Sequence, residues 1–339
     1  MKDEYVSDIS FIIVAKNEEF GIKKCLNSLK DLPLIACEVI CVDSGSDDST
    51  LEVMKGFVNY LPDMKIYKCS GYCNSAIARN VGLGNASKEL IFFIDGDIEV
   101  NYAFVKKAYY YLKNGICEAI TGQLGEIYYD EEYKKEIRHI KDRFRINEEE
   151  EIYNSGGCFM VKSSILSKVG LWDERMERNQ DIEYTLRLSR FGRFIAIPTS
   201  MGVHHTQEFN HRPLYFLKKC FPMFFGMLIR KNIDRPNVLI QLMKQNRGYL
   251  IGIPLYFFIF MFGIGQVLDF EPFNLCIFAI LFILTIDISN CLLHKKNIFN
   301  QFLVHYVYPL FIIIGFFIDY IGDNTSTQVQ QVYGDLCRR

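Results

Sequence analysis

Two aspartates separated by one glycine, Asp95-Gly96-Asp97, directly follow an apolar run at residues 90–94. A short run of this kind predicts a buried strand, and a glycine at its end permits close approach by a ligand. Carboxylate oxygens suit Mg²⁺ or Mn²⁺, and such an ion would hold a diphosphate and stabilise its growing charge as it leaves. Alone, the triplet is more typical of an ordinary turn.

A second polar segment, residues 43–50, follows another apolar run at 38–42 and leads into a predicted helix. Asp43 is expected to accept a hydrogen bond from an N–H of a nucleobase, while Ser44 and Gly45 allow the loop to close over a nucleoside. Ser49 is expected to cap the helix that follows. A plain strand-to-helix turn explains Ser49 and its neighbour but not the whole segment.

The elements that must position these residues are short strands alternating with amphipathic helices. Strands are predicted at residues 9–14, 38–42, 65–68 and 90–94, with helices at 18–29, 49–57 and 74–83. This alternation predicts an α/β fold with a mainly parallel, Rossmann-like sheet, whose ligands bind at the carboxyl ends of the strands. Residues 118–206 are less regular; strands are expected at 158–161, 194–197 and 202–205, and a helix at 180–191.

From about Arg247 onward the composition becomes almost continuously apolar. Segments 249–268, 273–293 and 302–321 are each about 20 residues long, enough to cross a bilayer as helices. We therefore expect a catalytic domain at 1–212, an interfacial amphipathic segment at 213–248, three transmembrane helices at 249–321 and a tail at 322–339. An ordinary packing helix remains the alternative for the interfacial segment.

The charges that flank the apolar segments predict which side of the membrane each part occupies. They are basic, acidic and then basic, which places the catalytic domain inside the cell and, with three spans, the tail outside. Arg338 and Arg339 argue mildly against an outside tail, and Asp287 and Asp319 are costly in lipid, so two spans or a re-entrant segment is the alternative.

The overall charge and the cysteines exclude other classes of protein. The formal net charge of −2 gives no basic field, so no nucleic acid partner is expected. The 11 cysteines lack the paired spacing of a zinc site. No signal-peptide apolar region precedes the first strand, and we expect an integral protein of a bacterial inner or plasma membrane with a cytoplasmic catalytic domain.

Four segments together resemble family 2 glycosyltransferases of the GT-A fold. They are IIVAKNEE, VDSGSDDST, AIARNVGLGNASKELIFFIDGDIEV and NSGGCFMVKSSILSKVGLWDERMERNQDIEYTLRLSRFG, in the order and spacing of that family. The resemblance implies a metal site at Asp95 and Asp97, with Asp97 the more direct ligand. It also implies a pocket for a nucleotide-diphosphate sugar, built from Ala15, Asn17, Glu18 and Asp43, with Arg79 near the nucleotide or diphosphate.

The same resemblance places a catalytic base at Asp181. The family commonly has a Glu-Asp pair at this point, whereas this chain has Gln180 before the aspartate. A base that removes the acceptor's proton contributes roughly 10²–10⁴-fold to the rate, and a single base opposite the departing diphosphate implies inversion. Without the upstream segments, Asp181 would be better explained as a carboxylate that favours a helix N-terminus.

A pair of histidines, His204 and His205, ends a predicted strand. Neighbouring residues of a strand point to opposite faces, so at most one is expected to reach the metal. The resemblance favours His205, and a structural histidine is the alternative. Gly156 and Gly157 either shape the sugar side of the pocket or form a simple turn, and Trp172 either lines the acceptor side or packs.

These observations predict an inverting, metal-dependent glycosyltransferase that moves one sugar, from a UDP-sugar, to a lipid-linked or cell-surface glycan acceptor. A polyprenyl-phosphate sugar synthase is the first alternative, since a lipid phosphate is already ionised and needs less help from a base. A non-catalytic membrane scaffold is the second. The glycine- and lysine-rich loop of nucleotidyltransferases is absent near the first strand, and no Gln-x-x-Arg-Trp element of processive synthases follows.

Overall fold

The computed structural model describes residues 6–30, 32–207, 217, 221–246, 298–317 and 327–333. The chain divides into two compact units. Residues 1–209 and 322–339 form the first unit, and residues 210–321 form the second. The sequence predicted a boundary at residue 212 and a separate tail, whereas this division groups the tail with the first unit.

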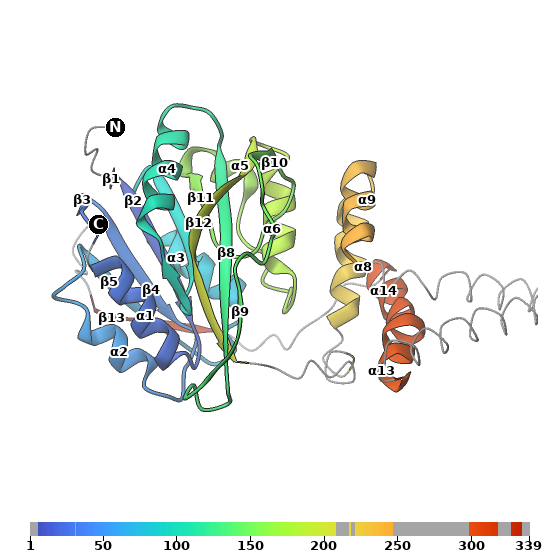
Figure 1. Ribbon diagram of the computed structural model, residues 1–339, viewed down its shortest axis with the longest axis horizontal. Helices are drawn as coiled ribbons and strands as arrows, with labels where there is room; N and C mark the ends of the chain where they lie inside the picture. The colour runs from blue at the N-terminus through green and yellow to red at the C-terminus, as the bar shows by residue number, and fades with distance from the viewer. Residues whose placement is uncertain are drawn as a thin grey trace, which may run out of the picture. The chain divides into compact units, whose positions relative to one another are not determined.

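A mixed sheet forms the first unit (Figure 1). Its parallel centre consists of β2 (Ile9–Ala15), β4 (Glu38–Asp43), β5 (Met64–Ser70) and β6 (Leu90–Asp95). The register pairs Ala15 with Asp43 and Val14 with Asp95, so the ends of these strands meet at one edge. All four strands lie where the sequence predicts them.

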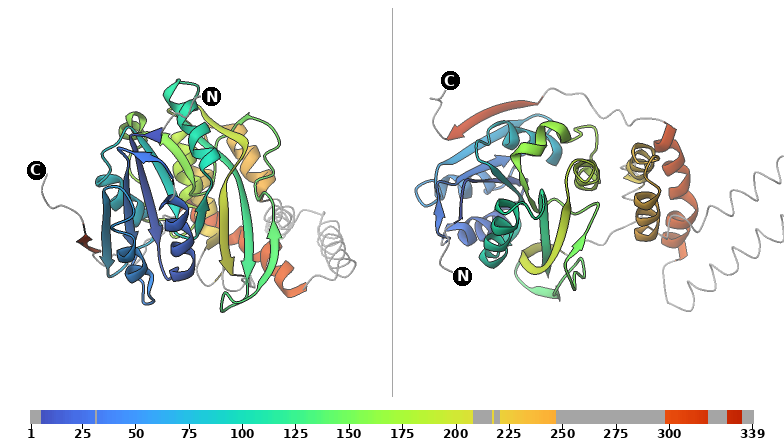
Figure 2. Two further views of the ribbon diagram at one scale, coloured as in Figure 1. Left: turned by 60° about the vertical axis from the view of Figure 1, so that its left-hand side comes forward. Right: turned by 90° about the horizontal axis from the view of Figure 1, so that it is seen from above.

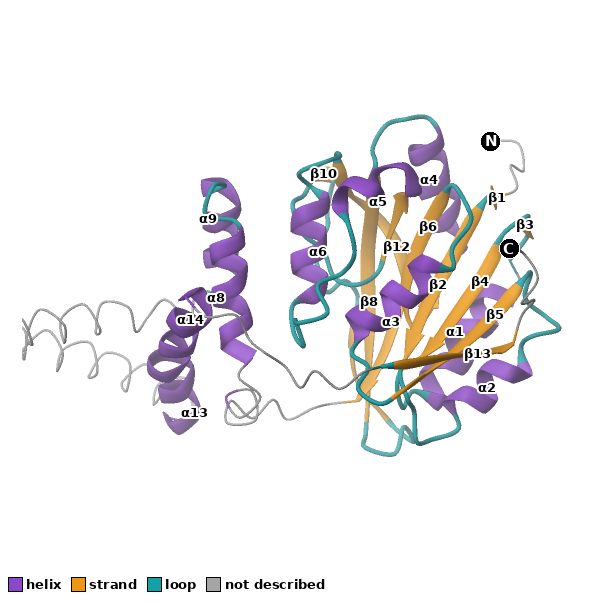
Figure 3. Ribbon diagram, turned by 180° about the vertical axis from the view of Figure 1, so that it is seen from behind, coloured by secondary structure: helices purple, strands orange, loops and turns teal. Residues whose placement is uncertain are grey.

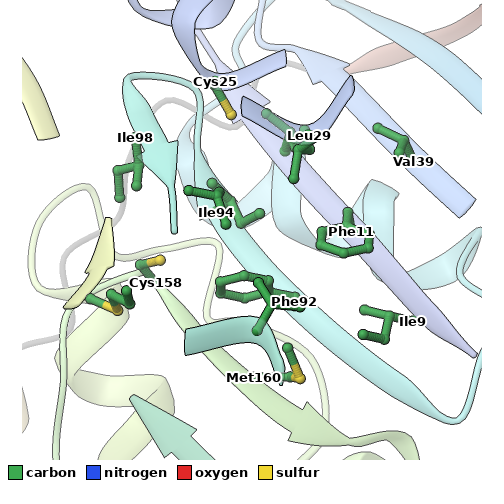
Figure 4. Packing of buried hydrophobic residues seen from close by; sticks show 14 of the residues in the cluster. Ile9, Phe11, Cys25, Leu29, Val39, Phe92, Ile94, Ile98, Cys158 and Met160 are labelled. Carbon is green, nitrogen blue, oxygen red and sulfur yellow. The ribbon is translucent and has the colours of Figure 1, made fainter. Parts of the chain in front are cut away.

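Helices cover both faces of this sheet because the side chains of each strand alternate between the two faces. On one face, α1 (Glu19–Lys30), α2 (Thr50–Gly56) and α4 (Tyr102–Lys113) bury apolar residues against Ile9, Phe11 and Ile13 (Figure 4). On the other face, α3 (Ser75–Gly84), α5 (Ser163–Val169) and α6 (Gln180–Leu188) pack against Ile12 and Val14. Because the sheet is packed on both faces, the ends of its strands hold the polar residues that follow them in fixed positions.

The less regular half of the domain contributes antiparallel and long strands (Figure 2). β8 (Ala119–Tyr129), which the sequence did not predict, pairs in parallel with β12 (Phe194–Gln207), a single strand where two were expected. Register shifts between Ile197 and Gly202 interrupt the pairing, and Pro198 lies at that point. A proline cannot donate to a ladder, which explains why the sequence pattern looks like two strands.

Shorter strands complete the first unit. β11 (Phe159–Lys162) joins β8 to β6, β7 (Ile98–Val100) pairs with β12, and β9 (Glu136–Ile140) pairs with β8. β10 (Glu150–Glu151) lies against β12, and β1 (Val6–Ser7) pairs with β3 (Leu34–Ile35). The pairing of β7 with β12 brings the residues that follow Asp97 next to the two histidines of β12.

The last described strand, β13 (Gln328–Tyr333), runs antiparallel to β5 (Figure 3). It lies after the apolar segments in the sequence, yet it extends the sheet of the catalytic domain. The sequence predicted no strand in the tail, so the pairing of residues 328–333 with β5 corrects that expectation.

The second unit is helical in its described part. It contains α8 (Phe221–Lys231), α9 (Pro236–Gln245), α13 (Ile298–Phe302), the π-helical turn η1 (Leu303–Val307) and α14 (Tyr308–Phe317). A Cβ added to Gly226 of α8 would lie 2.0 Å from the carbonyl oxygen of Ile312, and one added to Gly315 of α14 would lie 2.0 Å from that of Met223. Glycines at both positions thus allow the two helix backbones to touch.

One helix in the described part of the chain, Phe299–Phe317, is long and apolar enough to cross a membrane. It covers most of the third predicted span. The first two predicted spans, at 249–268 and 273–293, lie outside the described residues.

Candidate active site

A cavity of about 500 Å³ opens at the carboxyl ends of β2, β4 and β6. Acidic residues from three separate segments line it: Glu18 from the loop after β2, the aspartates after β6, and Asp181 at the start of α6. The remaining lining residues include Val14, Ala15, Lys16, Ser44, Cys73, Asn74, Ser75, Arg79, Arg143, Glu177, Arg178, Asn179, Gln180, Ile182 and His204. The strand ends therefore form the pocket that the sequence predicts.

Asp95 and Arg79 form an ion pair inside this cavity. The Asp95 Oδ1 atom lies 2.5 Å from Arg79 Nη2, and the guanidinium lies 4.6 Å from the centre of the Trp172 ring. A Cβ added to Gly157 would lie 2.4 Å from Arg79 Nη2 and 3.0 Å from Asp95 Oδ2. The absence of a side chain at Gly157 thus lets Arg79 and Asp95 lie close to the backbone, which a simple turn would not require. Trp172 packs against the guanidinium of Arg79.

Asp97 contacts His204 on the other side of the cavity. The distance from His204 Nε2 to Asp97 Oδ2 is 2.8 Å, and His204 Nδ1 lies 3.3 Å from Glu126 Oε1. Burial lowers the pKa of His204, but the charge of Asp97 and hydrogen bonds to Asp97 and Glu126 outweigh it and raise this pKa to about 10. Arg143 Nη1 lies 2.9 Å from Glu126 Oε1, so charges of alternating sign extend from Asp97.

His205 points away from Asp97, contrary to the expectation from the resemblance. Its Nε2 atom lies 3.0 Å from Glu99 Oε2, and its Nδ1 atom lies 3.0 Å from the hydroxyl of Tyr129. Only its backbone N–H reaches Asp97, donating to the carbonyl oxygen at 2.8 Å. The alternation of side chains along β12 was predicted correctly, but His204 is the residue on the cavity side.

Glu18 is buried next to the two aspartates. Among the described residues, neither Glu18 Oε2 nor Asp97 Oδ1 has a hydrogen-bond partner, although both are buried. The pKa of Glu18 is raised well above its ordinary value, first by burial and then by the charges of Asp97 and Asp95. A Cβ added to Gly96 would lie 2.7 Å from Glu18 Oε2, so glycine is needed between the aspartates.

These acidic side chains fit a divalent cation, because a cation would stabilise unpartnered carboxylate oxygens in a buried place. In the described part of the chain, no group of three or more His, Cys, Asp and Glu residues is placed to hold a metal ion. Mg²⁺ is usually held by one or two carboxylates together with phosphates and water. Asp97 and Glu18 therefore suit an ion shared with a bound diphosphate, while Asp95 is held by Arg79.

The predicted nucleoside loop is held together by its own hydrogen bonds. Asp43 Oδ1 accepts from the Ser46 backbone N–H at 3.0 Å and from its hydroxyl at 2.5 Å, and Asn17 Oδ1 accepts from the Asp47 N–H at 2.8 Å. Gly45 has a φ of +82°, which favours glycine. Of these residues only Ser44 lines the cavity, so Asn17, Asp43 and Gly45 shape the loop.

One atom of Asp43 takes no part in these hydrogen bonds. Its Oδ2 atom is buried and has no hydrogen-bond partner within the ranges that the structure describes. The predicted cap at Ser49 is wrong: its side chain makes no cap hydrogen bond. Instead Asp48 Oδ1 accepts from the Thr50 N–H at 3.0 Å.

Asp181 lies in the first turn of α6 and lines the cavity. Its Oδ1 atom accepts a hydrogen bond from the Ile182 N–H at 2.9 Å. Burial raises its pKa above the ordinary aspartate value, and this outweighs the opposing charge of Arg79. A raised pKa increases the proton affinity of a carboxylate, which suits a general base.

Several residues in or next to the cavity were not predicted from the sequence. Glu126, which contacts His204 from outside the lining, lies on β8, and Arg143, which lines the cavity, lies on the loop after β9. A single charged residue inside the apolar pattern of residues 119–129 was the signal available for Glu126. Arg178 and Glu177 immediately precede the predicted helix, and only proximity to Asp181 in the sequence pointed to them.

The match to a family model decides the class of this domain. Residues 10–170 match the model of the glycosyl transferase family 2. Over these residues, just under half of the chain, the sequence is similar to family 2 glycosyltransferases. The chain is an enzyme of the glycosyltransferase class, which disfavours the alternative of a non-catalytic scaffold.

Curated relatives carry names of the same class. Glycosyltransferase AglE of Haloferax volcanii is 22% identical over 239 residues, which cover 67% of this chain and 75% of that protein. Poly-β-1,6-N-acetyl-D-glucosamine synthase of Staphylococcus epidermidis is 29% identical over 203 residues, covering 56% of this chain and 47% of the synthase. This chain thus matches less than half of the synthase.

Solved structures share the fold. A crystal structure of S. aureus TarS in complex with UDP-GlcNAc aligns with a TM-score of 0.54 at 18% identity, covering 91% of this chain and 89% of that one. A likeness at this identity concerns the fold alone. The predicted GT-A, Rossmann-like fold is confirmed.

Proposed function

We propose that this glycosyltransferase moves one sugar, with inversion, from a UDP-sugar to a hydroxyl of a lipid-linked or cell-surface glycan. The observation that carries the proposal is that one cavity of about 500 Å³ is lined by both Asp97 and Asp181. A carboxylate suited to a divalent ion and a carboxylate suited to a base thus face one space. The donor is proposed by analogy with TarS, whose structures were solved with UDP and with UDP-GlcNAc.

On the donor side, Asp97 Oδ1 and Glu18 Oε2 would hold Mn²⁺ or Mg²⁺. When bound, the ion neutralises the negative charge that grows on the departing diphosphate. Ser44, on the loop that Asp43 holds in shape, would contact the nucleoside, and Arg79, fixed between Asp95 and Trp172, would orient the diphosphate. These residues bind and position, and they take no proton.

On the acceptor side, Asp181 would take the proton of the attacking hydroxyl. A bond forms between the acceptor oxygen and the anomeric carbon as the bond from that carbon to the diphosphate breaks, and its electron pair leaves with UDP. Attack from the side opposite the leaving group inverts the anomeric centre. The burial that raises the pKa of Asp181 strengthens it as a base.

The proposed acceptor follows from the second unit. A helix long and apolar enough to cross a membrane, Phe299–Phe317, belongs to the same chain as the catalytic domain. An enzyme attached to the membrane by its own helices works next to acceptors that are themselves lipid-linked. We place the catalytic domain at the cytoplasmic face of a bacterial inner or plasma membrane.

A polyprenyl-phosphate sugar synthase is the second candidate, and two cations favour it. Arg143 and Arg178 line the same cavity as Asp181. Guanidinium groups bind phosphate oxygens well, so a lipid phosphate placed there would itself attack the anomeric carbon. That reaction does not need a base, because the phosphate is already ionised.

The test is transfer by the purified full chain, with Mn²⁺, from a panel of UDP-sugars that begins with UDP-GlcNAc. We expect release of UDP that depends on metal and acceptor, and an inverted linkage by NMR. Loss of transfer in the Asp181→Asn variant with a hydroxyl acceptor supports the first candidate. Full transfer by that variant to a polyprenyl phosphate supports the second, and no release of UDP from any donor would contradict both.

A further inference from the structure

The tail of the chain, as β13, pairs with β5 and forms the last strand at one end of the catalytic sheet. β13 pairs with β5 through a register that places Gln328 opposite Ser70 and Gln330 opposite Lys68. The hydroxyl of Thr327 donates to the carbonyl oxygen of Tyr72, just beyond the end of β5. An edge strand exposes unpaired backbone groups, and this antiparallel partner satisfies them.

Side-chain packing accompanies the backbone pairing. Val332 packs against the core cluster that α1 and α2 form on the sheet, whereas Gln328 and Gln330 are exposed. β13 is therefore exposed along most of its length and makes one apolar contact with the core, as a strand at the edge of a sheet can. Figure 3 shows β13 beside β5 at the margin of the sheet, in the same unit as the active site.

The position of this strand restricts the path of the intervening chain. β12 ends at Gln207 and β13 begins at Gln328, and between them lie the apolar segments and the candidate span Phe299–Phe317. Backbone pairing cannot form through a bilayer, so both ends of this stretch lie on one side. Arg338 and Arg339, which follow the strand, agree with the cytoplasmic side by the positive-inside rule.

We propose that residues 327–333 return to the catalytic domain on its own side of the membrane, so that the chain between Gln207 and Thr327 crosses the bilayer an even number of times. This rests on the membrane attachment in the proposed function. It replaces the three-span arrangement with an outside tail that the flanking charges suggest. The membrane segment is then tied to the catalytic sheet at both ends rather than at one.

The returning strand also reaches the margin of the donor pocket. Tyr72, which accepts from Thr327, directly precedes Cys73 and Asn74, and both of these line the cavity. The Asn74 side chain accepts from the Ile77 N–H at 3.0 Å and donates to the Glu174 carbonyl at 2.8 Å. The tail therefore contacts the chain segment that leads into the cavity wall.

Cysteine cross-linking in membranes tests the pairing. In the full chain, Lys68→Cys combined with Gln330→Cys places two thiols on directly opposite residues of antiparallel strands, within the usual Cα separation of a disulfide. We expect oxidation to join positions 68 and 330, detected as a linked peptide by mass spectrometry without reductant. Glu52→Cys with Gln330→Cys is the control, because Glu52 lies on α2 and is not paired with β13; it should give no link.

Labelling tests the side of the membrane. Gln330 is exposed, so its cysteine is accessible to reagents on its own side. With the single Gln330→Cys variant, a membrane-impermeant maleimide should leave position 330 unmodified in intact cells and modify it after lysis, read peptide by peptide. Absence of the 68–330 link, or modification in intact cells, would overturn the proposal. Neither measurement involves transfer, so failure here leaves the proposed reaction standing.

Discussion

The side chain of His204 lies 2.8 Å from the carboxylate of Asp97, whereas the side chain of its neighbour His205 lies 3.0 Å from the carboxylate of Glu99. The two histidines are adjacent in the sequence and opposite in environment, which gives a matched pair of variants. His204→Gln should weaken Mn²⁺-dependent donor binding about 10-fold, because it changes the contact that orients the metal carboxylate. His205→Gln should leave that affinity within about twofold. Calorimetry with UDP and Mn²⁺ measures both, and equal losses would contradict the assignment of sides.

Replacing Asp181 with Asn should reduce transfer by roughly 10²–10⁴-fold while donor affinity changes little, because the base acts on the acceptor. Asp63→Asn, at an exposed position beside Lys65, serves as the control and should retain full activity. Separate measurement of donor affinity and of single-turnover transfer distinguishes the two effects. Weakened donor binding in the Asp181 variant would show that the residue belongs to the nucleotide site.

The pH dependence of transfer follows from the same residue. Asp181 must be ionised to accept a proton, and burial raises its pKa above the usual aspartate value. We therefore expect transfer to rise with pH through a midpoint that lies above the ordinary aspartate range, and to fall as the pH drops below it. The profile of kcat/KM for the free enzyme reports this value. The residual activity of Asp181→Asn should lack that acidic limb.

Gly157 and Gly156 provide a second matched pair. A Cβ at 157 would lie 2.4 Å from Arg79 Nη2, whereas one at 156 would meet nothing nearer than Phe144 Cζ at 3.4 Å. Gly157→Ala should displace the Arg79–Asp95 ion pair and weaken donor binding about 10-fold or more. Gly156→Ala should bind donor nearly normally. Unaltered binding in both variants would remove Arg79 from the donor site.

Glu38, the first residue of β4, is expected to stabilise the fold. Its Oε2 atom lies 2.7 Å from Lys65 Nζ, and its Oε1 atom accepts from Ser10 Oγ at 2.6 Å and from the Ser87 N–H at 2.6 Å. Glu38→Gln should lower the free energy of unfolding by about 2 kcal/mol, because a buried charged hydrogen-bond network loses one partner. Glu52→Gln, at an exposed pair, should change it by less than about 0.5 kcal/mol. Denaturant unfolding measures the difference.

The sign of the pH effect on Glu38 is also determined. Burial opposes ionisation, but hydrogen bonds from Lys65, Ser10 and Ser87 outweigh it and lower the pKa of Glu38 in the folded protein. The stabilisation is therefore present above the pKa of the unfolded chain and is lost as the pH falls through the lower folded value. The difference in stability between the natural chain and Glu38→Gln should shrink toward acidic pH.

The parallel half of the domain was predictable because local pattern and tertiary role coincide there. Apolar runs such as residues 9–14 are buried on both faces, and polar residues begin where the strands end. β8 was missed because glycines, Thr121 and Glu126 interrupt its apolar pattern, and its burial is decided by β12, which lies more than 70 residues away in the sequence. The choice of His204 over His205 depends on which face of β12 is turned toward the cavity, and no local pattern carries that information.

The contact between Gly226 and Gly315 has a consequence for how the second unit tolerates change. The atoms that a new Cβ would meet are backbone atoms of the opposite helix, not the ends of flexible side chains. No rotamer adjustment or truncation of a neighbour relieves such a clash, so alanine at either position must separate the two helix axes. Both positions must therefore remain glycine together, because a second substitution on the facing helix cannot relieve the clash that the first one causes.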